Sequence, residues 1–228
     1  FLLPFIVLTG YAIEYFDQSW DDRFWQYSWN SLYIAIVVSG ICLLLALILM
    51  FVRRVSPRST DSLPSRLSST GYALPGTVLA IGVLVPLTYL DFAINDVYDW
   101  FGARGPGLVF TGSAIAIVFA FTVRFLAIAI GSLENSYKRI SPSLDMASIT
   151  MGQTPQQLLI RVHLPLLRKG LLAGALLVFI ESMKELPAAL LLRPIGFENL
   201  ATYVFQFVSD EKLEHGALAA IVIVFVGL

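Results

Sequence analysis

Long apolar runs separated by short polar segments dominate the hydropathy pattern of this chain. Four of these runs are 23 to 27 residues long, and about 20 residues in a helix are enough to cross the hydrocarbon core of a bilayer. Lipid offers no hydrogen-bond partners to the backbone, so each run is predicted to be a helix. The four runs are residues 29–52, 68–90, 107–133 and 170–192.

The two ends of the chain are also apolar. Residues 1–13 and 216–228 are each 13 residues long, which is too short to cross a bilayer. We count them as two further segments and expect the chain to be truncated at both ends, since it begins with Phe1. The predicted fold class is an all-α membrane protein, a polytopic bundle of about six transmembrane helices in which residues 1–228 form a single domain.

Composition supports a membrane protein and excludes several other classes. Hydrophobic residues make up 57% of the chain and charged residues 14%, with a mean hydropathy of +0.77, whereas soluble domains have about 25% charged residues. The net charge of −1 gives no basic excess, so no nucleic-acid partner is expected. The single cysteine, Cys42, excludes an internal disulfide framework.

Charge is distributed unevenly between the two sides of the predicted bundle. The loops of one side contain nine Lys and Arg residues and three acidic residues, and those of the other side contain four basic and eleven acidic residues, including Asp91, Asp96 and Asp99. The positive-inside rule places the basic loops in the cytoplasm, together with both ends of the six-helix set. The nine basic residues are Arg53, Arg54, Arg58, Arg66, Lys138, Arg139, Arg161, Arg168 and Lys169.

Cap and proline signals organise residues 134–169, the longest predicted cytoplasmic loop. Ser141 before Pro142, and Thr154 before Pro155, are typical of a helix N-cap followed by proline at the first helical position. Two short helices are therefore predicted within this loop.

Two stop signals complete the loop. Gly152 is expected to end the first short helix, and Leu164-Pro165 to end the second, so that residues 141–165 form a protruding elbow. Two interpretations stay open from these residues alone: an amphipathic connector on the lipid surface, or a docking element for a cytoplasmic partner.

The elbow resembles the signature loop of bacterial ABC importer permeases, the inner-membrane components of binding-protein-dependent transport. That pattern reads Glu-Ala-Ala, three residues, Gly, nine residues, Ile, any residue, Leu-Pro. Met146-Ala147-Ser148, Gly152 and Val162-His163-Leu164-Pro165 match it with the same spacing. Met146 and Ser148 depart from the pattern, and Asp145, one position earlier, is available to supply the acidic charge.

Two further stretches resemble this superfamily. Residues 71–76 (Gly-Tyr-Ala-Leu-Pro-Gly) look like its third-helix region, and residues 184–187 (Lys-Glu-Leu-Pro) look like its ferric-iron branch. In that branch two six-helix halves are often fused in one polypeptide. This chain looks like one half, more like the C-terminal one.

The resemblance implies a set of partners. A dimer of ABC ATPases would dock on the cytoplasmic elbow, a periplasmic substrate-binding protein would dock outside, and a second permease half, fused or separate, would complete the pathway in the bacterial inner membrane. The chain has no P-loop, so no cofactor is expected on it and ATP would bind to the partner ATPase. The residues expected to couple to the ATPase are Asp145, Met146, Ala147, Ser148, Gly152, Gln153, Thr154, Pro155, Leu164 and Pro165.

Four charged residues lie within the predicted membrane segments: Arg124, Glu181, Lys184 and Glu185. Ionisable residues in a membrane are costly and usually face the interior or a water-filled path. One interpretation makes Glu181 and Glu185 oxygen ligands for a ferric ion along the translocation path. We favour the other, a charge-balanced structural lock that includes an Arg124–Glu181 pair, and no metal site is firmly expected.

Ferric iron is the expected substrate, on the resemblance alone. Thiamine, polyamine or another small solute are alternatives within the family, and an ion-coupled secondary carrier is a further alternative. An intramembrane enzyme would need a nucleophile–base pair or a His-Glu-x-x-His helix, and the sequence shows neither. The chain is therefore predicted to be a transport subunit and not an enzyme.

Overall fold

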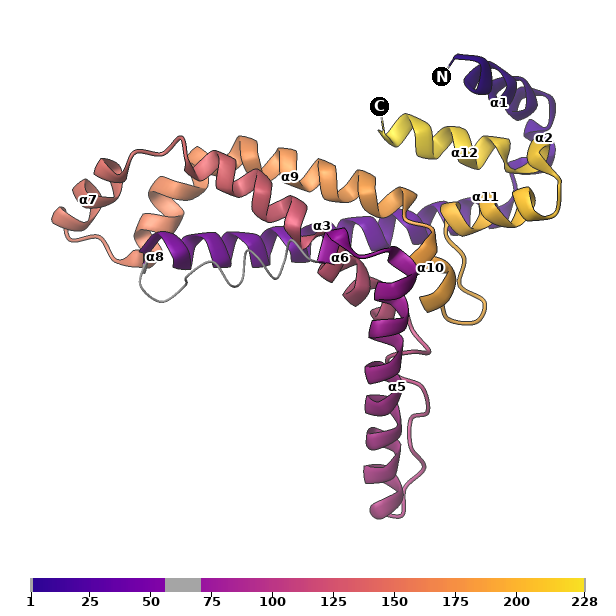
Figure 1. Cartoon of the computed structure of the whole chain (residues 1–228), viewed down its shortest axis with the longest axis horizontal. Helices are drawn as coiled ribbons and strands as arrows, with labels where there is room; N and C mark the ends of the chain where they lie inside the picture. The colour runs from indigo at the N-terminus through magenta and orange to yellow at the C-terminus, as the bar shows by residue number, and fades with distance from the viewer. Residues whose placement is uncertain (1, 56–70, 228) are drawn as a thin grey trace. The chain divides into compact units, whose positions relative to one another are not determined.

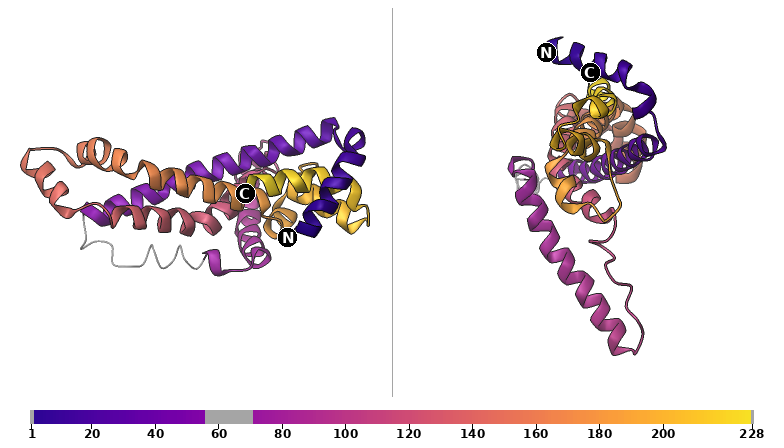
Figure 2. Two further views of the ribbon diagram at one scale, coloured as in Figure 1. Left: turned by 90° about the horizontal axis from the view of Figure 1, so that it is seen from above. Right: turned by 90° about the vertical axis from the view of Figure 1, so that its right-hand side faces the viewer.

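A computed structural model describes residues 2–55 and 71–227 of the chain. Arg58, Asp61 and Arg66, and the beginning of the predicted 68–90 segment, lie outside the described residues. The described parts consist of helices and loops, with no strand in either range. The predicted all-α fold is confirmed (Figures 1 and 2).

Four of the described helices are long and apolar enough to cross a membrane. They are α3 (Asp22–Val55), α5 (Gly76–Trp100), α6 (Ile115–Tyr137) and the continuous helical stretch Pro155–Lys184. Shorter helices are α1 (Leu2–Glu14), α2 (Phe16–Ser19), α7 (Pro142–Thr150), α10 (Pro187–Leu192), α11 (Leu200–Ser209) and α12 (Leu213–Gly227). The count of six spans stays a prediction.

The predicted helix over residues 170–192 is wrong as a single element. The helix α9 (Leu164–Lys184) ends at Lys184, and α10 begins at Pro187 after a two-residue break. Proline has no N–H to donate and disfavours helical geometry at the residue before it, so the apolar run divides at this point. Hydropathy does not detect this break because Leu186 and the residues of α10 are as apolar as the helix before them.

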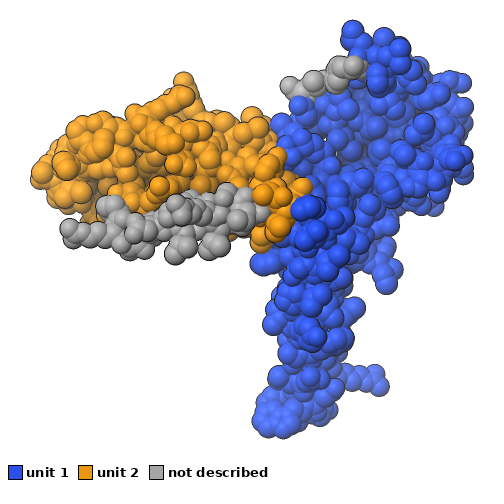
Figure 3. All heavy atoms as spheres, viewed as in Figure 1, with its two compact units in different colours: residues 1–37, 75–121, 180–228 blue, residues 38–74, 122–179 orange. Residues whose placement is uncertain are grey.

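The described chain divides into two compact units (Figure 3). Unit 1 contains residues 1–37, 75–121 and 180–228, and unit 2 contains residues 38–74 and 122–179. Three helices, α3, α6 and α9, contribute residues to both units.

The core of unit 2 is built where α3, α6 and α9 approach one another through small residues. Ser132 Oγ donates a hydrogen bond to the Gly170 carbonyl at 2.8 Å, and Ser39 Oγ donates to the Ala175 carbonyl at 2.9 Å. A Cβ atom on Gly170 would lie 1.9 Å from Ser136 Oγ, so only glycine allows this approach. Small residues and hydroxyl groups are the usual means by which membrane helices pack closely.

Unit 1 contains α1, α2, α5, α10, α11 and α12. Asn199 caps α11 through a reciprocal capping box with Thr202, and the Leu200 N–H donates to Ser31 Oγ of α3 at 2.8 Å. A Cβ on Gly216 of α12 would meet the Phe207 side chain at 3.2 Å, so α12 packs closely on α11. These contacts fix α11 and α12 within this unit.

Residues 107–113 return along α5 inside unit 1. The predicted segment 107–133 therefore begins as a loop, and its helix, α6, starts only at Ile115. The Asp91 carboxylate, which is fully buried, accepts hydrogen bonds from the backbone N–H groups of Val109, Phe110 and Thr111 at 2.8–3.0 Å. The loop is thus anchored to α5 by backbone donors.

Candidate functional site

The first helix of the elbow, α7, begins as the sequence predicts. Ser141 is its N-cap, with the Ser143 N–H donating to Ser141 Oγ at 3.3 Å, and Pro142 occupies the first turn. Asp145 lies in the first turn, where a negative charge is favourable to the helix dipole. The local signals in the sequence are confirmed here.

A glycine turn ends α7. Gly152 has φ +77°, its N–H donates to the Ile149 carbonyl at 2.9 Å, and the Gln153 N–H donates to the Ser148 carbonyl at 3.1 Å. This pair of bonds is a Schellman motif, in which the left-handed residue is usually glycine because a side chain is strained there. Ser148 Oγ also donates to Gln153 Oε1 at 2.6 Å across the turn. Ser148 and Gln153 therefore hold the turn together from within.

The second helix of the elbow does not end where the sequence predicts. Thr154 and Gln157 form a capping box at the start of α8 (Pro155–Leu158). The chain then continues through a π-helical turn, η1 (Leu159–His163), directly into α9. Pro165 cannot donate to the carbonyl four residues before it, and the wider π turn accommodates this loss without ending the helix. The prediction that Leu164-Pro165 stops the helix is wrong.

Large apolar side chains cover the outside of the elbow. Met146, Ile149 and Met151 are 69%, 61% and 72% exposed. Gly152 is exposed too, and a Cβ atom placed on it would meet nothing within 4 Å. Unit 2 by itself therefore leaves both the apolar side chains and the glycine uncovered.

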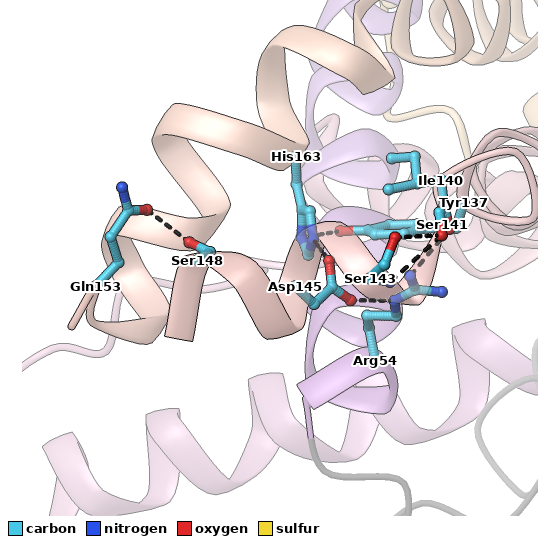
Figure 4. A network of polar contacts seen from close by, with 9 residues as sticks. All are labelled: Arg54, Tyr137, Ile140, Ser141, Ser143, Asp145, Ser148, Gln153 and His163. Atoms are coloured by element: carbon cyan, nitrogen blue, oxygen red, sulfur yellow. Dashed lines mark hydrogen bonds and ion pairs between the residues drawn. The ribbon is translucent and has the colours of Figure 1, made fainter. Parts of the chain in front are cut away.

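A polar network joins the inner side of α7 to the rest of unit 2 (Figure 4). Asp145 Oδ2 accepts a hydrogen bond from Arg54 Nε at 2.6 Å, and Asp145 Oδ1 lies 2.9 Å from His163 Nε2. Arg54 Nη2 also donates to the Ile140 carbonyl at 3.0 Å. The network connects the last turn of α3, the loop before α7, α7 itself and η1.

His163 lies at the centre of this network and is fully buried. Tyr137 Oη is 3.4 Å from His163 Nδ1, and the rings of Tyr137 and Phe51 contact the imidazole edge-on at centroid distances of 5.3 and 5.7 Å. When the ring is neutral, these contacts fit an Nε2–H that donates to Asp145 and an Nδ1 that accepts from Tyr137.

The environment of Asp145 favours its ionised form. Partial burial by itself raises the pKa of this carboxyl, but the hydrogen bonds from His163 and Arg54, together with the positive charge of Arg54, outweigh burial and lower the pKa below its usual value. Both carboxylate oxygens are engaged within unit 2. The acidic charge that Asp145 was expected to supply to the elbow is therefore already paired.

Sequence reasoning did not anticipate the partners of Asp145. Arg54 is 91 residues and His163 is 18 residues away along the chain. His163 occupies the position of the family pattern where any residue is allowed, and no short-range pattern connects it to Arg54. Only a signal about contacts between distant positions would have found this network.

The four charged residues of the predicted membrane segments are divided between the two units. Glu181 Oε1 and Lys184 Nζ of unit 1 form an ion pair at 2.7 Å. Glu185, also in unit 1, is buried beside Gly76, and its Oε1 accepts from the Ala188 N–H at 3.4 Å. Arg124 Nη1 donates to the Leu74 carbonyl at 2.6 Å within unit 2.

The roles predicted for these four charged residues stay predictions. Arg124 and Glu181 belong to different units, so their pairing stays a prediction. Within residues 2–55 and 71–227, no group of three or more His, Cys, Asp or Glu side chains could hold a metal ion.

The fold is similar to that of a chain from a solved bacterial ABC transporter. Of the solved structures, a chain of a bacterial alginate ABC transporter, in complex with an alginate-bound periplasmic protein, matches 99% of this chain and 85% of its own length with a TM-score of 0.66 and 14% identity. Identity this low shows the fold alone. No family model matches the chain.

The sequence relatives are permease proteins of transport systems. The chain is 27% identical to the ferric transport system permease protein FbpB of Actinobacillus pleuropneumoniae, over 64% of this chain and 21% of that protein. It is 23% identical to the putative 2-aminoethylphosphonate transport system permease protein PhnV of Salmonella typhimurium, over 98% of this chain and 78% of that protein. It is 24% identical to the thiamine transport system permease protein ThiP of Escherichia coli, over 87% of this chain and 35% of that protein.

These findings confirm the resemblance to ABC importer permeases that the elbow indicates. The match spans about a fifth of the ferric transport permease of A. pleuropneumoniae and about a quarter of one from Haemophilus influenzae. The substrates in the names of these relatives differ: ferric iron, 2-aminoethylphosphonate and thiamine.

Proposed function

We propose that the chain is the transmembrane permease part of an ATP-driven importer in the bacterial inner membrane. Substrate would arrive from a periplasmic binding protein, and a dimer of ATPase subunits would bind ATP and drive transport from the cytoplasm. The chain itself would bind no nucleotide. A second permease half would pair with it to enclose the path.

The observation that supports this proposal most strongly is the form of the elbow. The left-handed Gly152 and the apolar side chains of Met146, Ile149 and Met151 are uncovered in unit 2. An exposed apolar patch is typical of a surface that another protein or a membrane covers, and the family resemblance of the elbow favours a protein. Because glycine adds no side chain, the turn can fit closely into a cleft of that protein.

The mechanism follows from this geometry. ATP-driven closure of the ATPase dimer would displace the elbow, and α9 would move with it because η1 continues into α9 without a break. The permease would then alternate between states that open to the two sides of the membrane. This scheme requires a rigid connection between the elbow and the helices of unit 2.

Ferric iron is the proposed substrate. Support comes from three relatives named as ferric transport permeases, one of them as putative, from A. pleuropneumoniae and H. influenzae. They are 26–28% identical over 62–64% of this chain. The phosphonate and thiamine permeases cover more of the chain at slightly lower identity, so these two solutes are the alternatives. The described residues hold no cluster of metal ligands, so we assign selection of the substrate to the binding protein.

Co-purification tests the permease assignment. Full-length protein, extracted in mild detergent, should retain an ATP-hydrolysing subunit from its native host. Uptake should stop when the gene for that ATPase is deleted. If uptake persists without the ATPase but stops when the proton gradient is collapsed, the proposal is wrong and the ion-coupled carrier is the better assignment.

An uptake assay tests the substrate separately. Cells that lack the gene should regain import of ferric iron when the wild-type gene is restored, whereas import of thiamine and of 2-aminoethylphosphonate should be unaffected. Restored import of either alternative solute, without that of iron, would replace the substrate and leave the permease assignment in place.

A further inference from the structure

The helix α7 has little apolar packing of its own. Ser148 is its one buried residue, whereas Leu144, Met146 and Ile149 are all substantially exposed. Apolar burial usually holds a helix in place, and here it is nearly missing. The contacts that hold α7 to unit 2 are therefore mainly polar, and the strongest of them converge on Asp145.

The geometry around Asp145 differs from that of an ordinary surface ion pair. Its two oxygens bind two different elements, Arg54 at the end of α3 and His163 in η1, and the side chains of Arg54 and Asp145 are only 22% and 16% exposed. Ion pairs that are partly removed from water are screened less than exposed ones. This arrangement resists movement of α7 in two directions at once.

We propose that Arg54, Asp145 and His163 form a coupling link, which transmits displacement of α7 to the inner ends of α3 and α9. The proposal rests on the proposed function, since it assigns these side chains a role in passing the movement of the ATPase to the membrane helices. All three are positioning residues: they contact neither ATP nor substrate.

The π-helical turn explains why His163 can take part. A π turn contains one residue more than an α turn, so the side chains on either side of it are rotated by about 100° relative to an unbroken α-helix. η1 ends at His163 itself, and its geometry directs the imidazole toward Asp145, Phe51 and Tyr137. Single π turns of this kind often occur at functional positions.

His163 also brings a fourth element into the link. One ring nitrogen faces Asp145 of α7 and the other faces the hydroxyl of Tyr137, the last residue of α6. Residues 138–141, which join α6 to α7, would otherwise act as a hinge. With the imidazole in place, bending at this connection would break at least one of the two contacts.

The ratio of substrate imported to ATP hydrolysed distinguishes a coupling role from a structural one. Full-length permease, its ATPase and the binding protein would be reconstituted in liposomes with the transported substrate. We expect His163→Leu to retain ATPase binding and ATP hydrolysis. The number of substrate molecules imported per ATP should fall about fivefold or more.

Two matched variants serve as controls. Lys138→Met removes an exposed ion pair with Glu134 near the same end of α6, and it should leave the ratio unchanged. His163→Gln places an amide nitrogen near the position of Nε2, keeps the donor to Asp145, and should recover much of the ratio that His163→Leu loses.

Amide hydrogen exchange gives a readout that does not depend on transport. Residues 142–150 should exchange faster in His163→Leu, while α11 and α12 in unit 1 keep their wild-type protection. If His163→Leu does not fold, Arg54→Lys takes its place. This variant keeps the charge but loses the bond to the Ile140 carbonyl. It should show a smaller fall in the number of substrate molecules imported per ATP.

The outcomes distinguish failure of the coupling link from failure of the proposed function. Normal ATPase binding with an unchanged import ratio in His163→Leu, or in Arg54→Lys if it replaces that variant, would overturn the coupling link and leave the permease assignment intact. Failure of the wild-type protein to bind any ATPase would overturn the proposed function itself.

Discussion

Two aspartates organise polar contacts in the two units, and they do so with different donors. Asp91 in unit 1 accepts from the N–H groups of three consecutive loop residues and from the Thr111 hydroxyl at 2.7 Å. Among the residues that the structure describes, the donors to Asp145 in unit 2 are the side chains of Arg54 and His163. The first joins a loop to the helix just before it, and the second joins elements up to 91 residues apart.

The difference shows how each contact depends on the sequence. Every residue except proline supplies a backbone donor at positions 109–111, so a single carboxylate at position 91 specifies the anchor. The contact at Asp145 needs a particular residue at each of three distant positions. A local anchor is suited to a loop that stays in place, whereas a side-chain link is suited to elements that must move together.

Loss of Asp91 should have the largest effect on folding. Asp91→Ala leaves three backbone N–H groups without their acceptor. Each of these donors that stays shielded from water costs about 1–3 kcal/mol in the free energy of unfolding. Much less protein should accumulate in the membrane, and the thermal midpoint of the purified protein should fall. Asp91→Asn keeps one acceptor oxygen and should lose less stability than Asp91→Ala. An equal loss of stability in the two variants would contradict the role of Asp91 as acceptor for the loop backbone.

Loss of Asp145 should have a smaller and more local effect. Asp145→Asn removes the charge from two hydrogen bonds, and charged hydrogen bonds contribute about 1.5–3 kcal/mol. Unlike the loss of Asp91, this loss should destabilise α7 alone. Limited proteolysis should cut near residues 142–150 while unit 1 stays intact. Equal destabilisation of both units would contradict the local role of Asp145.

The pH dependence of the link follows from the lowered pKa of Asp145. Because the folded pKa lies below the unfolded value of about 3.9, the stabilisation is fully present above that value and is lost as pH falls through the folded pKa. A spin label on Thr150→Cys should keep its mobility from neutral pH to about pH 5, and become mobile below about pH 4. Mobilisation between pH 7 and 5 would show that another group controls the link.

The smallest effect is expected at the exposed ion pair of Glu134 and Lys138. Their side chains are 37% and 67% exposed, and such a pair on one helix face contributes about 0.5 kcal/mol or less. The thermal midpoint of Lys138→Met should match that of the wild type within error. A clear loss of stability would mean that solvent exposure does not explain why this ion pair should contribute less stability than the contacts of Asp145.

The sequence predicts those features that depend on neighbouring residues. The caps at Ser141 and Thr154, and the left-handed turn at Gly152, follow from local chemistry and are present in the structure. The apolar runs predict long helices because length and hydropathy are sufficient for that purpose. This is why the fold class and the elbow follow from the residues alone.

Other features depend on competition between local rules or on distant contacts. Pro187 and Pro165 give the same local signal, yet one follows a break and the other lies within a continuous helix that contains a π turn. Packing of the surrounding helices decides between these outcomes. The partners of Asp145 are likewise set by how α3 and η1 fold back on α7, which no short segment encodes.

Glycine turns allow the central claim to be tested with a matched pair. Gly152 and Gly102 both have positive φ, +77° and +70°, and a Cβ on either would meet nothing within 4 Å. Alanine should therefore introduce similar backbone strain at both positions, about 1–2 kcal/mol. The two variants should differ only if another protein covers one of the turns.

The most direct measurement is the amount of ATPase that co-purifies with Gly152→Ala compared with Gly102→Ala. If the elbow is the surface on which the ATPase docks, the first variant should lose most of the bound ATPase and of the uptake, while the second retains both. Equal retention of the ATPase by the two variants would show that the elbow is not that surface.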